Sequence, residues 1–255
     1  MSSSLYWQRE GAGEDLVLVH GWGMNGAVWQ QTVDVLSSCF QVHVVDLPGY
    51  GYSAGCHAGS LQEIVEQLLA EAPEQAIWVG WSLGGLIATH IALNYPQRIK
   101  KLVTVASSPK FSAEKPWRGI QPKVLAAFTD LLSQDFAVTV ERFMVLQAMG
   151  SPTAKQDIKA LKQAVLSRPE PNPGALQLGL GLLADIDLRS QLKGICQPFL
   201  RLYGRLDGLV PVSVAEDVTV LHPDSKPFTF AKSSHAPFMT ELDEFCAQLL
   251  LFSGK

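Results

Sequence analysis

Three residues of this 255-residue chain have the types and the order that nucleophilic catalysis by a serine requires. Ser82 is the centre of the pentapeptide GWSLG, which fits the Gly-x-Ser-x-Gly elbow, a tight strand-to-helix turn that exposes a serine hydroxyl. The hydroxyl is a weak nucleophile near neutral pH, so it needs a base within reach and an acid that orients the base. The order Ser, Asp, His therefore predicts Ser82 as nucleophile, Asp207 as acid and His235 as base.

Each of these residues comes just after an apolar run that is typical of a buried strand. The runs cover residues 76–79, 199–204 and 228–231. Reactive groups in parallel α/β sheets gather past the carboxyl ends of the strands, so the three side chains are expected to meet at one edge. A turn aspartate or a surface histidine is common on its own, and the prediction therefore depends on the whole set.

Other acids and bases fit these roles less well. His222 precedes the last strand run instead of following it. Asp185 and Asp187 precede the strand that should deliver the acid. His20 comes before the nucleophile and suits a loop beside it better than the role of base.

A glycine-rich loop supplies candidate donors for the oxyanion of the reaction. The strand run at residues 16–19 ends in HGWGMN, whose glycines let backbone N–H groups point into a site. The N–H groups of Trp22 and of Leu83, the residue after the nucleophile, are the predicted donors. A plain loop between a strand and a helix is the alternative.

The rest of the chain indicates an α/β architecture. Strand runs at residues 16–19, 42–45, 76–79 and 102–105 alternate with helical patterns, which predicts a mostly parallel central sheet with helices on both faces. Between about residues 109 and 189 long amphipathic patterns replace the strands. We therefore expect a single domain over residues 1–255 with a helical lid insertion at about 109–189.

Composition excludes several classes of protein. No apolar run reaches the roughly 18 residues that a membrane span needs, the N-terminal residues lack the pattern of a secretory signal, and the net charge of −4 disfavours nucleic-acid binding. The four cysteines lack zinc spacing, which predicts no metal site and favours reduced thiols in a cytoplasmic protein. They are Cys39, Cys56, Cys196 and Cys246.

Five strings resemble the BioH carboxylesterase family of the biotin pathway, a branch of the α/β-hydrolase superfamily. They are VHGWG, WVGWSLGG, VASSP, LYGRLDGLVP and HAPF. The resemblance covers nearly the whole chain. It implies hydrolysis of the methyl ester of pimeloyl-[acyl-carrier protein] to methanol and the free carboxylate, without metal or organic cofactor, by a cytoplasmic protein expected to be a monomer.

The resemblance also implies which residues line the substrate site. They are Trp22, Ser82, Leu83, Phe143, Met144, Val145, Leu146, Gln147 and His235. An acyl chain needs an apolar slot with few polar anchors, and Phe143, Met144 and Leu146 could supply one, with Gln147 as the anchor. The alternative is that these side chains only pack the lid onto the body.

Basic residues in the lid indicate where an acyl carrier protein could dock. Arg142 precedes three lysines at i, i+4 and i+7, which share one helix face. They are Lys155, Lys159 and Lys162. Carrier proteins are acidic, so Arg142, Lys155 and Lys159 are the predicted docking residues, and a solvated face damped by Asp157 is the alternative. The family is expected to have arginines here, so these lysines and Val138 predict weaker or altered docking.

Two other functions use the same scaffold. Relatives with this triad cleave carbon–carbon bonds, or perform elimination in the menaquinone pathway. A ligand receptor is a third possibility, but such receptors often lose the histidine, and His235 is present. Ser82 disfavours haloalkane dehalogenases and epoxide hydrolases, which have an aspartate at the elbow.

Overall fold

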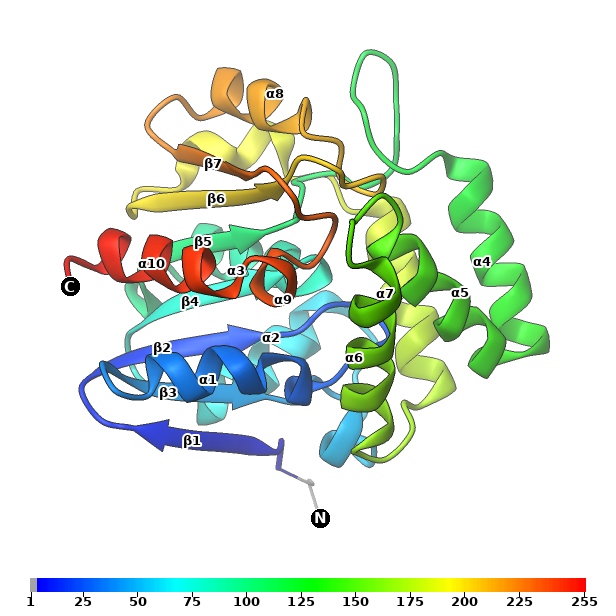
Figure 1. Ribbon diagram of the computed structural model, residues 1–255, viewed down its shortest axis with the longest axis horizontal. Coiled ribbons are helices and arrows are strands. Elements are labelled where there is room, and N and C mark those ends of the chain that lie inside the picture. Colours follow the sequence, from blue (N-terminus) through cyan, green and yellow to red (C-terminus); the bar gives the residue numbers. More distant parts are fainter. Residues whose placement is uncertain (1–3) are drawn as a thin grey trace.

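Seven strands form one sheet in the order β1-β3-β2-β4-β5-β6-β7 (Figure 1). The computed structural model describes residues 4–255. The strands are β1 (Trp7–Gly11), β2 (Glu14–Val19), β3 (Phe40–Val45), β4 (Ala76–Trp81), β5 (Ile99–Val105), β6 (Phe199–Gly204) and β7 (Lys226–Phe230). All neighbouring strands are parallel except β1, which runs antiparallel to β3. The predicted fold class, a mostly parallel sheet between layers of helices, is confirmed.

The central strands are buried because helices cover both faces of the sheet. All six residues of β4 and all six of β6, including Arg201, are buried, as expected of central strands in a parallel sheet. In Figure 1, α1 and α10 lie on the near face and α2 and α3 on the far face. The covering helices are α1 (Gln30–Leu36), α2 (Leu61–Glu71), α3 (Leu83–Asn94), α8 (Val214–Leu221), α9 (Pro237–Thr240) and α10 (Leu242–Ser253). Within residues 4–255 no helix has both the length and the apolarity needed to cross a membrane.

Four helices between β5 and β6 form what we call the lid segment, residues 122–185. They are α4 (Pro122–Gln134), α5 (Phe136–Ala148), α6 (Ala154–Leu166) and α7 (Pro173–Asp185). In Figure 1 they lie beyond the arrowheads of the parallel strands, over the edge where residues that follow those strands meet. The lid segment thus covers the edge at which the sequence places the three reactive side chains.

Some elements escape the sequence patterns for physical reasons. β1 is a partly exposed edge strand with no apolar run. α7 begins at Pro173, inside a proline-rich break, because proline suits the first turn of a helix. A short helix, α9, follows the last strand and precedes α10. The chain turns between them at Glu241, whose carboxylate accepts hydrogen bonds from the Lys232 N–H and the Ser233 hydroxyl.

A buried ion pair joins the lid segment to the body of the protein. The Arg168 guanidinium, just after α6, donates to Asp46 Oδ1 at 2.6 Å. The carboxylate of Asp46 is fully buried and also accepts the N–H groups of Gly26 and Tyr52. The guanidinium lies over the rings of Tyr6 and Tyr52.

Four charged residues link the two ends of the lid segment. Lys110 and Glu114 precede α4, whereas Asp187 and Arg189 follow α7. Lys110 pairs with Glu114 and Asp187, and Arg189 pairs with the same two acids. The hydrogen bonds from Arg189 are the main reason why the pKa of Asp187 is lowered to about 2. These ion pairs therefore hold the segment that leaves the sheet after β5 close to the segment that returns to it before β6.

His20 fixes the loop that follows β2. Its Nδ1 donates to the carbonyl of Gly21 at 2.8 Å, and its Nε2 accepts the Leu47 N–H at 3.0 Å. This pattern needs a neutral ring, because a protonated Nε2 cannot accept. Burial is the main cause that lowers the pKa of His20 to about 4.

We expect Arg168→Met to lower the free energy of unfolding by about 3–5 kcal/mol, because it leaves the buried Asp46 carboxylate without its cation. Arg168→Lys should lose less, since it keeps the charge. Urea titration measures both. Lys162→Met is the control: its ion pair with Glu141 at 2.9 Å is exposed and is expected to contribute less than about 1 kcal/mol. Equal losses in Arg168→Met and Lys162→Met would contradict the prediction.

His20 makes stability depend on pH. Between the folded pKa of about 4 and the unfolded value of 6.5, the unfolded chain binds more protons, so stability rises with pH across that window. The stabilisation is complete above pH 6.5 and is lost as the pH falls towards 4. His20→Gln should therefore be destabilising at pH 7, and its deficit should shrink by about 2–3 kcal/mol at pH 4.5. Urea titrations at both pH values test this, and a constant deficit would refute it.

Candidate active site

Ser82 occupies a strained turn between β4 and α3. Its backbone has φ 54° and ψ −117°, a left-handed conformation that costs a residue with a side chain on the order of 1–3 kcal/mol. The surroundings hold it: the Ser82 N–H donates to the Val105 carbonyl, and the Ser107 hydroxyl donates to the Ser82 carbonyl. Gly80 must lack a Cβ, which would collide with the backbone of Gly84. The flanking glycines of the motif thus permit the turn.

The three residues predicted to act together are joined by hydrogen bonds. His235 Nε2 lies 2.9 Å from Ser82 Oγ, and His235 Nδ1 lies 2.7 Å from Asp207 Oδ2. Asp207 Oδ1 accepts the N–H groups of Leu209 and Val210, so the carboxylate is fixed. Since a carboxylate only accepts, Nδ1 carries the proton and Nε2 is left to accept from the serine hydroxyl. All three side chains are buried.

The backbone of His235 is held from two sides. The Trp81 indole Nε1 donates to the His235 carbonyl at 2.7 Å, and the His235 N–H donates to the carbonyl of Gln147 in α5 at 3.1 Å. The Trp81 ring also packs edge-on against Phe238, with ring centroids 4.9 Å apart. Sequence reasoning assigned no role to this indole in supporting His235, and its only signal was an aromatic residue directly before Ser82.

The loop after β2 runs beside the nucleophile. A Cβ on Gly21 would lie 3.2 Å from the Cβ of Ser82. Within residues 4–255 neither the Trp22 N–H nor the Leu83 N–H donates a hydrogen bond. Leu83 opens α3, where first-turn N–H groups have no acceptor within the helix. Both predicted donors therefore belong to segments that adjoin Ser82.

The Trp22 side chain connects this loop to the lid segment. Its Nε1 donates to the Leu176 carbonyl of α7 at 2.8 Å, and its ring packs edge-on against Phe143 of α5 at 4.7 Å between centroids. α7 passes close to the indole at Gly179, where a Cβ would lie 2.5 Å from the ring. The indole is fully buried between the two lid helices and the loop.

The residues expected to line the substrate site face different ways on α5. Phe143, Met144 and Gln147 are buried, and Leu146 is half-buried. The Val145 side chain is 45% exposed. Gln147 Oε1 is buried and has no hydrogen-bond partner within the described part of the chain. The structure thus brings Gln147 to the histidine and leaves Val145 facing solvent.

The residues expected to dock a carrier protein lie on the surface of the lid segment. Arg142, Lys155 and Lys159 are exposed, and among the described residues none of them forms an ion pair. Lys162 differs, because its ammonium pairs with Glu141 at 2.9 Å. Three of the four basic side chains are therefore available to an acidic partner.

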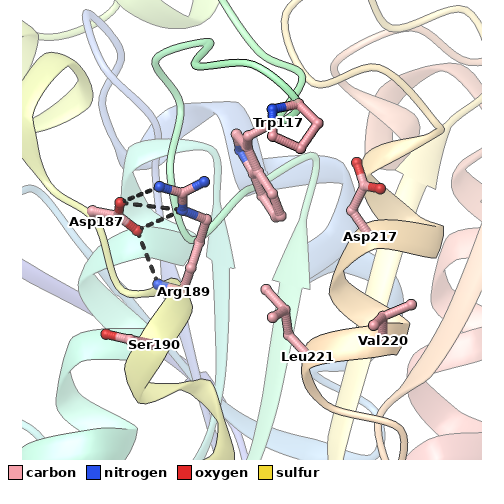
Figure 2. A pocket seen from close by; sticks show the side chains of 8 residues that line it. Trp117, Asp187, Arg189, Ser190, Asp217, Val220 and Leu221 are labelled. Atoms are coloured by element: carbon pink, nitrogen blue, oxygen red, sulfur yellow. Dashed lines mark hydrogen bonds and ion pairs between the residues drawn. The ribbon is translucent and has the colours of Figure 1, made fainter.

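The other acids and bases lie in separate surroundings. His222 Nε2 bonds the Ile195 carbonyl, and Asp187 belongs to the charged cluster at the ends of the lid segment. A hollow of about 470 Å³ includes Asp187 but none of the three reactive residues. Figure 2 shows the side chains that line it. It is lined by Pro116, Trp117, Asp187, Arg189, Ser190, Asp217, Val220 and Leu221. Across residues 4–255 no three His, Cys, Asp or Glu side chains are grouped to hold a metal ion.

Comparison with known proteins agrees with this geometry. A family model for the alpha/beta hydrolase fold matches residues 16–242. The chain is 65% identical to the pimeloyl-[acyl-carrier protein] methyl ester esterase of Vibrio campbellii and 66% identical to that of Vibrio cholerae, over 100% of both chains in each case.

Solved structures show the same fold at low identity. A bromoperoxidase from Bacillus anthracis has a TM-score of 0.88 at 22% identity, covering 98% of this chain and 95% of its own. An esterase from Exiguobacterium antarcticum has a TM-score of 0.84 at 21% identity, covering 98% and 96%. The chain therefore belongs to the α/β-hydrolase family and, within it, to the family of the pimeloyl-[acyl-carrier protein] methyl ester esterases.

Proposed function

We propose that this protein is a serine carboxylesterase that hydrolyses the methyl ester of pimeloyl-[acyl-carrier protein], giving methanol and the free carboxylate for biotin biosynthesis. The observation that supports this most directly is the hydrogen-bonded series from Ser82 through His235 to Asp207. The substrate is inferred from the names of the relatives with high sequence identity. We regard residues 1–255 as one hydrolase domain with residues 109–189 as its lid.

In the first half of the reaction Ser82 attacks the ester carbonyl. His235 Nε2 takes the hydroxyl proton, and Asp207 holds the ring and stabilises its charged form. The tetrahedral intermediate then collapses, the carbon–methoxy bond breaks, and the imidazolium gives its proton to the methoxide oxygen, which leaves as methanol. In the second half, water attacks the acyl-enzyme with His235 again as base.

Backbone amides stabilise the charge that develops on the carbonyl oxygen. The N–H groups of Trp22 and Leu83 are the proposed donors, because both adjoin Ser82 and neither donates a hydrogen bond within residues 4–255. Each such donor is typically worth about 3–4 kcal/mol in the transition state.

The acyl chain lies under the lid in this proposal. Trp22, in the loop beside the nucleophile, and Phe143, which packs against it, give apolar surface, and Met144 is a further buried apolar residue of α5. The unpartnered Gln147 amide oxygen offers one polar contact. Leu146 contributes at the margin. Val145 is exposed to solvent, so it would contact only the part of the substrate that emerges from the lid.

The acyl carrier protein docks on the outer surface of the lid. Arg142, Lys155 and Lys159 present unpaired positive charge there on a protein of net charge −4. An acidic partner is steered by such a patch and oriented by it. Lys162 contributes less, because Glu141 already pairs with it.

Ester hydrolysis is favoured over the two alternatives with the same triad. The relatives that are 65% and 66% identical to this chain are named as methyl ester esterases, not as carbon–carbon hydrolases or menaquinone-pathway enzymes. A receptor function is disfavoured because His235 is in contact with both Ser82 and Asp207.

We further propose that the enzyme is a cytoplasmic monomer that works without metal or organic cofactor. Cys39, Cys196 and Cys246 carry free thiols, which fits a reducing compartment. The proposed chemistry uses only side chains and backbone amides of this chain, so it needs no further group.

Ser82→Ala is expected to lower turnover of methyl pimeloyl carrier protein at least about a thousandfold, because it removes the nucleophile. Methanol release measures turnover, and thermal unfolding checks that the variant is folded. Ser133→Ala, which removes an exposed hydroxyl on α4, is the matched control and should behave as the wild type. Full activity of Ser82→Ala would end the assignment.

Replacing Arg142, Lys155 and Lys159 by glutamine is expected to lower kcat/KM for the carrier-bound ester at least about tenfold at low salt, because exposed charges steer association. A small soluble methyl ester should be hydrolysed as before. The matched control replaces Lys193, Lys226 and Lys232, which are exposed outside the lid, and removes the same charge. Equal losses on both substrates would argue against a docking role.

A further inference from the structure

Asp157, in the first turn of α6, is buried and surrounded by hydroxyl groups. Its Oδ2 accepts from Ser151 Oγ at 2.7 Å and from Thr240 Oγ1 at 3.3 Å, and both carboxylate oxygens lie within 3.1 Å of Thr153 Oγ1. An acid in the first turn usually serves the helix N-terminus from the surface. Here the carboxylate is 9% exposed, and no basic side chain of residues 4–255 pairs with it.

These hydroxyls come from two different parts of the fold. Ser151 and Thr153 belong to the turn between α5 and α6, which is part of the lid segment. Thr240 ends α9, the short helix that begins two residues after His235. The side chain of Asp157 therefore joins the lid turn to the loop that carries the catalytic base.

The lid also contacts the His235 loop at two further points. The His235 N–H donates to the Gln147 carbonyl at 3.1 Å, and the Ser234 hydroxyl donates to the Met149 carbonyl at 2.9 Å. Gly150, with φ +91°, lies against Leu206 in the loop after β6, next to the catalytic acid. The end of α5 and the start of the lid turn, residues 147–151, thus support the backbone on both sides of the His235–Asp207 hydrogen bond.

We propose that Asp157 is a positioning residue for the esterase reaction. It gathers the hydroxyls of Ser151, Thr153 and Thr240, keeps the lid turn against the His235 loop, and so holds the imidazole between Ser82 and Asp207. The inference rests on the proposed function, because it concerns the base of that triad. Asp157 touches none of the reacting groups and acts through Thr240 and the lid turn.

A residue that positions the imidazole and a residue that only covers the substrate have different effects on kinetics. A small displacement of a catalytic group can lower a rate by about a hundredfold even when the substituted residue is remote. Loss of imidazole placement lowers kcat for every ester, including one too small to contact the lid. Loss of a residue that only covers the substrate raises KM for long acyl chains and leaves kcat and KM for small esters unchanged.

The test measures kcat and KM for p-nitrophenyl acetate with full-length variants. Asp157→Ala is expected to lower kcat by about ten- to a hundredfold, and Thr240→Val by about three- to tenfold, through imidazole displacement. KM should stay within about twofold, since the missing contacts do not involve substrate. Thr240→Val keeps the shape of the side chain, so it remains informative if Asp157→Ala fails to fold.

Two variants control for stability. Asp135 caps α5 at the end of the helix away from Gln147 and accepts from the Val138 N–H, so Asp135→Ala weakens a lid helix without touching the His235 loop. The kcat of Asp135→Ala should equal that of the wild type. Thr240→Ser keeps the hydroxyl, so its kcat should also be close to the wild-type value, unlike that of Thr240→Val. A low-field NMR signal from the His235 Nδ1 proton is expected in the wild type, because that proton is shared with Asp207 at 2.7 Å, and it should weaken in Asp157→Ala and Thr240→Val only.

Unchanged kcat in both Asp157→Ala and Thr240→Val would overturn the positioning role, as would an equal loss in Asp135→Ala. Wild-type protein that fails to hydrolyse p-nitrophenyl acetate, or Ser82→Ala that hydrolyses it normally, would overturn the proposed function instead. The two failures are therefore distinguishable in one set of assays.

Discussion

The structure depends on one imidazole that must contact a hydroxyl and a carboxylate at the same time. His235 lies 2.9 Å from Ser82 Oγ and 2.7 Å from Asp207 Oδ2, although the three residues come from loops far apart in the chain. The parallel sheet brings the three residues near one another, because the loops after β4, β6 and β7 leave it at one edge. The final placement of the ring comes from two hydrogen bonds of the His235 backbone: the Trp81 indole donates to its carbonyl, and its N–H donates to the Gln147 carbonyl in the lid.

Burial strengthens these hydrogen bonds. Ser82, His235 and Asp207 are covered by the lid segment, so hydrogen bonds and amide dipoles act there without competition from water. The elbow geometry has a cost, since Ser82 has a left-handed backbone that few residues with side chains adopt. The surrounding bonds to Val105 and from Ser107 offset that cost. Strain, burial and exclusion of water are thus properties of the same few residues.

Local sequence patterns were enough to predict the sheet, the elbow and the meeting of Ser82, His235 and Asp207, because buried strands and tight turns leave strong local signals. They missed β1 and the support from Trp81, which depend on contacts between residues distant in sequence. The position of Val145 was predictable, however. A helix that turns 100° per residue puts residues 143 and 147 on one side and residue 145 almost opposite, as the exposure of Val145 shows.

The close passage of α7 over Trp22 has an evolutionary consequence. Gly179 leaves no space for even one more carbon beside the indole, whose Nε1 is held by the same helix. A larger residue at position 179 must therefore displace either the helix or the indole, and the indole forms a wall of the proposed acyl slot. Divergence at this single site would remodel the slot while the triad stayed intact, which gives the scaffold a way to acquire new chain-length preferences without rebuilding its chemistry.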